Sequence, residues 1–168
     1  TGRPFDAVVC VFGIFFVEDM AAALRSLHDR VAPGGTLAVT TWGADTFEPG
    51  DTVFWNAVKG EDASLYKAFN PWDRISTPEG LGALFREAGI DGVRIEPEAV
   101  DHPLRSPEDF WTVVLGTGYR ATVERLTSEA RERVRAACVE GLRRDAVRSI
   151  AANVIYATVT KPAGGPRA

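Results

Sequence analysis

The sequence predicts an α/β fold with neighbouring parallel strands, and three consecutive segments near its start carry that prediction. Residues 7–12 are continuously apolar and rich in β-branched side chains, which is typical of a buried strand. Residues 20–31 then repeat apolar side chains at helical spacing, and residues 36–42 return to a strand pattern. Two strands joined through a helix are expected to be parallel, with a right-handed crossover.

Local signals indicate where these elements begin and end. Asp19 precedes the helix, where its carboxylate can accept hydrogen bonds from free backbone N–H groups. The run Pro33-Gly34-Gly35 is expected to stop the helix and form the turn, because proline breaks helices and glycine adopts positive φ readily.

The remaining chain alternates loops, helices and strands without an internal repeat or a dividing linker. We therefore expect one domain over residues 1–162, with a long aromatic insertion at 43–76 and a disordered tail at 163–168. Helix starts are expected at Thr77-Pro78-Glu79, Ser106 and Thr127, a short helix at 53–60, and strands at 93–100 and 150–160.

Composition narrows the class of protein. The 168 residues are 45% hydrophobic and 25% charged, with a net charge of -4 and no basic run outside one helix, which argues against nucleic acid as a partner. No apolar stretch reaches about 18 residues, which argues against a membrane span, and no signal peptide is visible. Cys10 and Cys138 lie in apolar segments, so we expect reduced core residues of a cytoplasmic protein and no metal site.

The span Phe5–Gly43, FDAVVCVFGIFFVEDMAAALRSLHDRVAPGGTLAVTTWG, resembles the middle of class I S-adenosylmethionine (SAM) dependent methyltransferases of the type 11 or UbiE-like group. The resemblance implies a partial Rossmann-like sheet with strand order 4-5-7-6, the last strand antiparallel, and helices on both faces. The family's glycine-rich SAM loop and its ribose-binding acid belong to earlier strands and do not occur in this sequence. The resemblance therefore implies the carboxyl-terminal half of such an enzyme, with an incomplete SAM site.

The expected SAM contacts lie in the loop that leaves the first strand. In open α/β sheets, ligands bind beyond the carboxyl ends of the strands. By resemblance, Phe12, Gly13, Ile14 and Phe15 face the methionine part of SAM, and Gly13 permits close backbone approach. A structural alternative stays open, in which the phenylalanines of this loop are only core or interface residues.

The aromatic insertion is the expected position of a small, fairly apolar acceptor. By resemblance, Trp42, Trp55 and Trp72 line its pocket, although a packed satellite core is the alternative. His102 follows a strand and is the one weak candidate for a catalytic base, with an ordinary loop histidine as the alternative. Glu18 and Asp19 follow the SAM loop, but helix capping is the simpler role for Asp19.

Two further hypotheses compete with or extend this reading. Residues 116–121 fit the dinucleotide pattern G-x-G-x-x-A, but the expected acidic residue about 20 positions later is replaced by a charged helix, so the glycines are expected to break helices instead. The alternative to an enzyme is a non-catalytic, self-associating or partner-binding module derived from a methyltransferase. In either case the first strand, apolar and uncharged from Ala7 to Phe16, predicts a homodimer.

Overall fold

The structure, a computed structural model, describes residues 3–67 and 69–163 and divides the chain into two compact units. The first unit combines residues 1–44, 70–99 and 153–168, and the second combines 45–69 and 100–152. The sequence predicts a single domain and contains no signal for this division, in which residues 100–152 fold with part of the aromatic insertion. Residues 164–168 of the predicted disordered tail lie outside the described residues.

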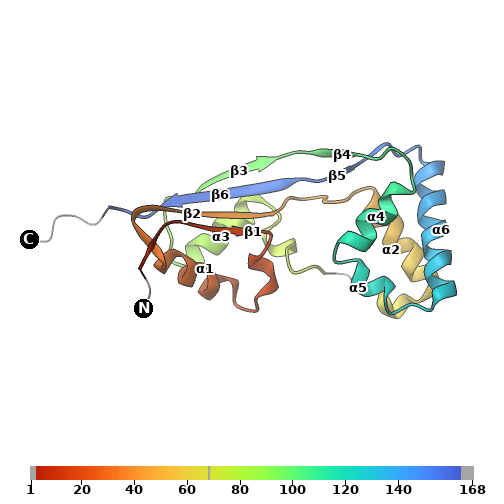
Figure 1. The fold of residues 1–168 in the computed structure, drawn as a ribbon, viewed down its shortest axis with the longest axis horizontal. Helices are drawn as coiled ribbons and strands as arrows, with labels where there is room; N and C mark the ends of the chain where they lie inside the picture. Colours follow the sequence, from red (N-terminus) through yellow and green to blue (C-terminus); the bar gives the residue numbers. More distant parts are fainter. Residues whose placement is uncertain (1–2, 68, 164–168) are drawn as a thin grey trace, which may run out of the picture. The chain divides into compact units, whose positions relative to one another are not determined.

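The elements of each unit are shown in Figure 1. The first unit contains strands β1 (Phe5–Val11), β2 (Val31–Trp42), β3 (Arg94–Glu98) and β6 (Val154–Thr160), helices α1 (Met20–Asp29) and α3 (Pro78–Glu87), and 3-10 helices η1 (Ile14–Phe16) and η3 (Asp73–Ile75). The second unit contains helices α2 (Gly50–Glu61), α4 (Asp109–Gly116), α5 (Arg120–Val123) and α6 (Ser128–Arg144), 3-10 helix η2 (Ala63–Leu65), and strands β4 (Asp101–Pro103) and β5 (Ser149–Ala151).

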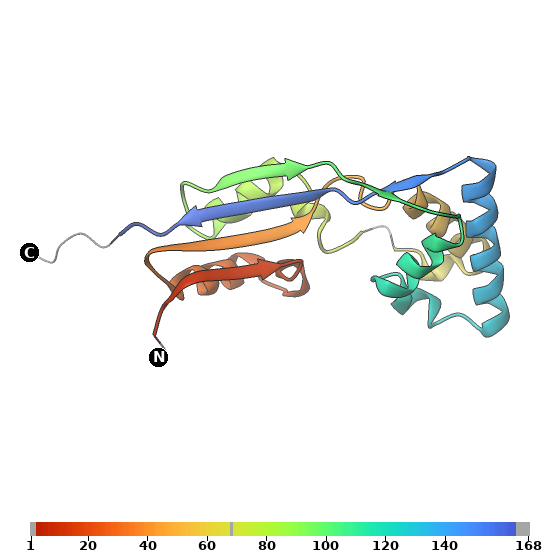
Figure 2. The ribbon, with the colours of Figure 1, turned by 45° about the horizontal axis from the view of Figure 1, so that its top comes forward.

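The four-stranded sheet of the first unit has the order β1-β2-β6-β3 (Figure 2). β1 and β2 are parallel, and their register places Val9 beside Ala38. β6 is antiparallel to both of its neighbours, β2 and β3. This arrangement confirms the predicted order 4-5-7-6, and it leaves β1 at one edge of the sheet and β3 at the other.

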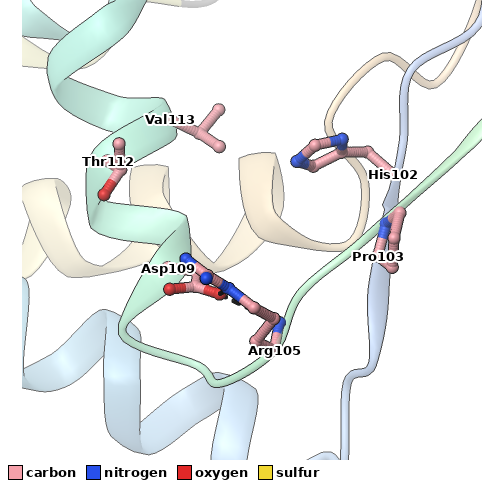
Figure 3. Close-up of a pocket in the computed structure, with 6 residues that line it drawn as sticks. All are labelled: His102, Pro103, Arg105, Asp109, Thr112 and Val113. Carbon is pink, nitrogen blue, oxygen red and sulfur yellow. Dashed lines mark hydrogen bonds and ion pairs between the residues drawn. The ribbon is translucent and has the colours of Figure 1, made fainter.

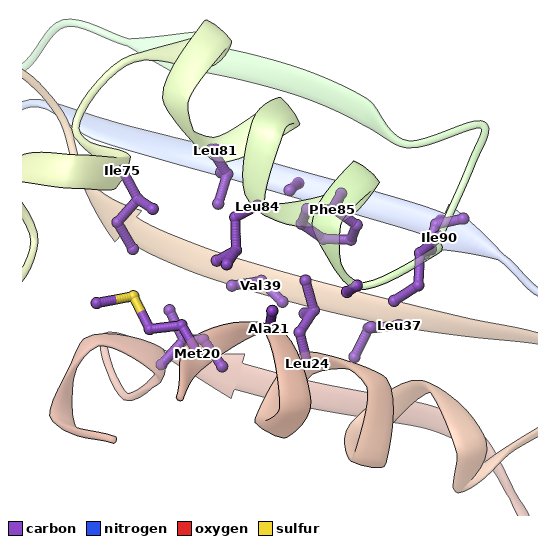
Figure 4. Close-up of a cluster of buried hydrophobic side chains, with 14 of the residues drawn as sticks. Met20, Ala21, Leu24, Leu37, Val39, Ile75, Leu81, Leu84, Phe85 and Ile90 are labelled. Carbon is purple, nitrogen blue, oxygen red and sulfur yellow. The ribbon is translucent and has the colours of Figure 1, made fainter. Parts of the chain in front are cut away.

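The core of the first unit lies between the sheet and the helices α1 and α3 (Figure 4). Leu24 of α1, Phe85 of α3 and Leu37 of β2 each have no exposed surface. The sequence predicts helices on both faces, but both helices of this unit cover the same face. On the other face β1 exposes Val9 by 62% and Val11 by 58%.

Helix caps follow the sequence closely. The side chain of Asp19 accepts a hydrogen bond from the Ala22 N–H at 2.8 Å, and that of Thr77 accepts one from the Gly80 N–H at 3.1 Å. Thr127 caps α6 in the same way, through the Ala130 N–H at 3.2 Å. These three predicted helix starts are therefore confirmed, because the local side-chain chemistry is sufficient to place them.

Three predicted element bounds are wrong. The helix expected from a Ser106 cap begins at Asp109, with no side-chain cap. Helix α1 ends at Asp29, and the run Pro33–Gly35 lies inside β2, where the β1–β2 register shifts and Gly34 has a φ of +81°. The single closing strand over 150–160 is two strands, β5 and β6, which pair in different units. The latter two segments are extended and apolar, so the alternation in the sequence does not show where the pairing partner changes.

The second unit is built around α2 and α6. A Cβ atom on Gly141 of α6 would lie 2.9 Å from a methyl carbon of Val53 in α2, so the glycine allows the two helices to approach closely. Phe54, Phe110 and Leu142 have no exposed surface. Cys138 is buried and free, and burial raises the pKa of its thiol to about 12, so the thiol stays protonated near neutral pH.

Two absences hold for the described part of the chain only. Among residues 3–67 and 69–163, no helix is long and apolar enough to cross a bilayer. In the same residues, no group of three or more histidine, cysteine, aspartate or glutamate side chains could hold a metal ion.

Candidate functional site

The carboxyl ends of β1 and β2 meet at one end of the sheet in the first unit. The Phe12 N–H donates a hydrogen bond to the Thr40 carbonyl at 2.9 Å, which extends the pairing of the two strands by one residue. The Phe12 ring stacks on Trp42, with 4.2 Å between ring centroids and 26° between ring planes. The structure therefore brings together one predicted SAM residue and one predicted acceptor residue.

The backbone turns sharply where this strand ends. Phe12 has a φ of +48°, in the left-handed region that residues other than glycine rarely adopt. Such outliers are held only where the surrounding structure imposes them, and they concentrate at binding and catalytic sites. This turn directs residues 13–16 across the end of the sheet.

Gly13 lets the turned loop pack onto the strand that it has just left. A Cβ atom at this position would lie 3.2 Å from the Cys10 sulfur, a contact tighter than most real side chains make. Burial raises the pKa of the Cys10 thiol, and a hydrogen bond from the Gly13 N–H partly opposes that rise. Gly13 thus suits the close packing of this loop, whether or not a ligand also approaches it.

The aromatic residues of the loop divide between core and surface. Ile14 and Phe15 are buried, with 2% and 3% of their surfaces exposed, whereas Phe16 is 77% exposed. The Phe15 ring packs edge to face against the Trp72 ring, with 5.5 Å between ring centroids. The centroids of the Phe15 and Phe16 rings are 4.8 Å apart. The side chains of Ile14 and Phe15 belong to the core, so any contact of theirs with SAM must involve the backbone. That these residues bind SAM stays a prediction.

The side chains at this end of the sheet are mainly apolar and aromatic. Phe12, Phe16 and Trp42 offer apolar and aromatic surface suited to the uncharged parts of SAM. No acidic side chain ends β1 or β2, and Asp19, which follows the loop, accepts a helix hydrogen bond. The ends of β1 and β2 therefore offer aromatic surface, and no strand-end carboxylate, to a ligand.

The third predicted pocket tryptophan, Trp55, lies in the second unit and is 6% exposed. Its indole N–H donates to an Asp51 carboxylate oxygen at 3.0 Å, and the Tyr119 hydroxyl donates to the same oxygen. Burial, reinforced by the Asp51 carboxylate, raises the pKa of Tyr119 far above its ordinary range, so this hydroxyl stays a donor. Phe54 and Tyr66 pack their rings against Trp55, at centroid distances of 5.0 and 5.7 Å.

His102 lies in the second unit, at the rim of a cavity of about 400 Å³ (Figure 3). The cavity is lined by His102, Pro103, Arg105, Asp109, Thr112 and Val113. The sequence singled out the histidine but not Arg105 or Thr112, because its patterns do not show that the β4 segment and α4 line one cavity. The role of His102 as a base stays a prediction.

Comparison with known proteins identifies similar structures but no similar family or curated sequence. No protein-family model matches the chain, and no curated protein matches it. The chain is similar to a protein from Anabaena variabilis described as a methyltransferase of an antibiotic biosynthesis pathway, with 16% identity and a TM-score of 0.52. That match covers 95% of this chain and 70% of the other.

Two other solved structures are more distant. A Bacillus halodurans protein, also described as a methyltransferase, has 16% identity and a TM-score of 0.44, with 96% of this chain and 66% of that chain covered. Phosphoethanolamine N-methyltransferase 2 from Haemonchus contortus, solved with SAM, has 14% identity and a TM-score of 0.43. This chain spans 35% of the length of the Haemonchus protein.

Proposed function

We propose that this chain, which has the class I SAM-dependent methyltransferase fold, forms one wall of a methyltransferase active site. The observation that carries the proposal is the aromatic surface where β1 and β2 end, built on the strained turn at Phe12. Ligands of open α/β sheets bind at this end of the strands. In this proposal the Phe12–Phe16 loop faces SAM, and a small, fairly apolar acceptor packs against Trp42 and Trp72.

Methyl transfer from SAM requires few catalytic groups from the protein. The sulfonium of bound SAM supplies an activated methyl group, so the protein contributes mainly orientation and exclusion of water. The exposed Phe16 and the half-buried Trp42 and Trp72 supply apolar surface for both tasks.

The first prediction is that this chain alone binds SAM weakly or not at all. Its aromatic wall can contact the uncharged parts of SAM, but neither β1 nor β2 ends on an acid that could hold the ribose. Calorimetric titration of the chain with SAM checks this. A micromolar dissociation constant, equivalent to about -8 kcal/mol, would contradict the prediction of an incomplete site.

A longer polypeptide, in which a glycine-rich methyltransferase half precedes Thr1, tests the proposed function itself. It should bind SAM, and Phe16→Ala should weaken binding by about tenfold, or about 1.4 kcal/mol. Phe69→Ala is the matched control, because Phe69 is also exposed, by 64%, but belongs to the second unit. Equal SAM affinity of the Phe16→Ala and Phe69→Ala variants would show that the Phe12–Phe16 loop does not contact SAM. Failure of the longer chain to bind SAM would instead favour the non-catalytic module.

A further inference from the structure

The cavity of the second unit combines groups that no proposed step uses. Its volume of about 400 Å³ lies in the usual range for small-molecule sites and exceeds what an inorganic anion needs. One wall comes from β4 and the segment after it, and the other comes from α4 (Figure 3). Asp109, Thr112 and Val113 share a face of α4 because they are spaced three and four residues apart.

Arg105 presents a guanidinium group at one edge of this cavity. Its Nε donates to an Asp109 carboxylate oxygen at 3.2 Å, and its backbone N–H donates to the same oxygen at 2.9 Å. Of these two contacts only the one from Nε holds the guanidinium itself, and the side chain as a whole is 93% exposed. Within the described residues, no contact is formed by its two terminal nitrogens. An arginine held in this way can offer those nitrogens to a carboxylate.

The other lining groups differ in character around the cavity. The His102 ring lies across the cavity from α4 (Figure 3), and Thr112 of α4 also lines the cavity. Pro103 and Val113 supply apolar surface. Cationic and neutral donors therefore occur beside an apolar wall, which is the pattern expected for a ligand with one anionic end and one apolar end.

From this arrangement we propose that the cavity binds a small carboxylic acid with an apolar body. The carboxylate lies against the Arg105 guanidinium and the His102 imidazole, and the body packs on Pro103 and Val113. Asp109 also lines the cavity and pairs through one carboxylate oxygen with the Arg105 Nε and backbone N–H, so the ligand is held by the two terminal nitrogens of the guanidinium, which this pair leaves open. This binding site is independent of the proposed methyl transfer and of the SAM wall in the first unit.

The test titrates the full chain with 3-phenylpropionate and follows the histidine ring protons by NMR. The chain has two histidines, so a His102→Gln variant assigns both signals. We expect saturable shifts of the His102 signal and none of the His28 signal. The neutral analogue 3-phenylpropionamide should bind at least about tenfold more weakly, because it lacks the charge that Arg105 recognises. Inorganic phosphate should also bind more weakly, because it does not reach the apolar wall.

Variants separate this site from a general effect of charge. Arg105→Gln should weaken 3-phenylpropionate binding by at least about tenfold. Arg120→Gln is the matched control, because Arg120 also pairs through its Nε with an acid four residues later, Glu124, on an exposed helix surface. Both variants should keep the far-UV circular dichroism of the parent chain. Equal binding by the two variants, equal binding of acid and amide, or absence of saturation at millimolar acid would each overturn the proposal.

Discussion

Replacing Trp55 by alanine is expected to destabilise the protein by about 3–5 kcal/mol, the usual range for truncating a buried aromatic side chain. Trp55 is 6% exposed and packs against the rings of Phe54, Tyr66 and Tyr119. The truncation leaves a cavity among these rings and removes one of the two side-chain donors to Asp51. Urea unfolding followed by circular dichroism measures the loss.

Two comparison variants make this result specific. Trp55→Phe keeps most of the ring but loses the indole N–H, so it should cost only about 1 kcal/mol. Trp72→Ala should cost less than Trp55→Ala, because Trp72 is only half-buried and contacts Phe15 at its edge. If both alanine variants unfold at the same urea concentration, the greater burial of Trp55 does not give it a larger contribution to stability, and the prediction is wrong.

The same variants test the predicted acceptor pocket. A pocket residue affects acceptor use more than stability, whereas a core residue does the reverse. In the longer, SAM-binding polypeptide, Trp72→Ala is expected to impair acceptor use with little change in SAM affinity. For Trp55 the burial favours a core role. Loss of acceptor use in the stable Trp55→Phe variant would show instead that this side chain lines the pocket.

Lysine at position 9 is expected to abolish a homodimer that forms through β1. β1 pairs with β2 on one side and, within the described residues, with no other strand, so its other side presents unpaired backbone groups. Phe5, Val9 and Val11 on this strand are each more than half exposed. An apolar edge of this kind invites pairing with another chain, and a second copy can supply the same strand in the antiparallel direction.

The opposite edge of the sheet shows the contrast. β3 carries the charged residues Arg94, Glu96 and Glu98, together with Pro97, and all of these features discourage pairing between sheets. β1 has a charge only at Asp6, near its start. The distribution of charge therefore selects β1 as the edge through which two copies would join into one longer sheet.

Light scattering at micromolar concentration checks the dimer. The parent chain has a mass of 18.2 kDa and should scatter as a particle of twice that mass. The Val9→Lys variant should be monomeric or should aggregate, because the substitution places a charge in the pairing strand. Thr158→Lys is the control, since Thr158 lies in β6, which is separated from β1 by β2. A monomeric parent chain with rapidly exchanging β1 amides would rule out this interface.

The sequence by itself determined the parts of the protein that depend on local chemistry. The apolar run of β1 and the caps Asp19, Thr77 and Thr127 identify strands and helices correctly, because each depends on residues close in the chain. The resemblance of Phe5–Gly43 to methyltransferases added the strand order, which the sheet confirms.

Only the tertiary structure decided how distant segments combine. The resemblance grouped Trp42, Trp55 and Trp72 in one pocket, but Trp42 and Trp72 pack near the Phe12 loop, whereas Trp55 packs in another unit. The break between β5 and β6 was equally hidden. Hydrophobic patterns show which side chains become buried, but not against which partner. The packing partner is decided by contacts between residues far apart in the chain. Those contacts place Trp42 and Trp72 near the Phe12 loop and Trp55 in the core of the other unit.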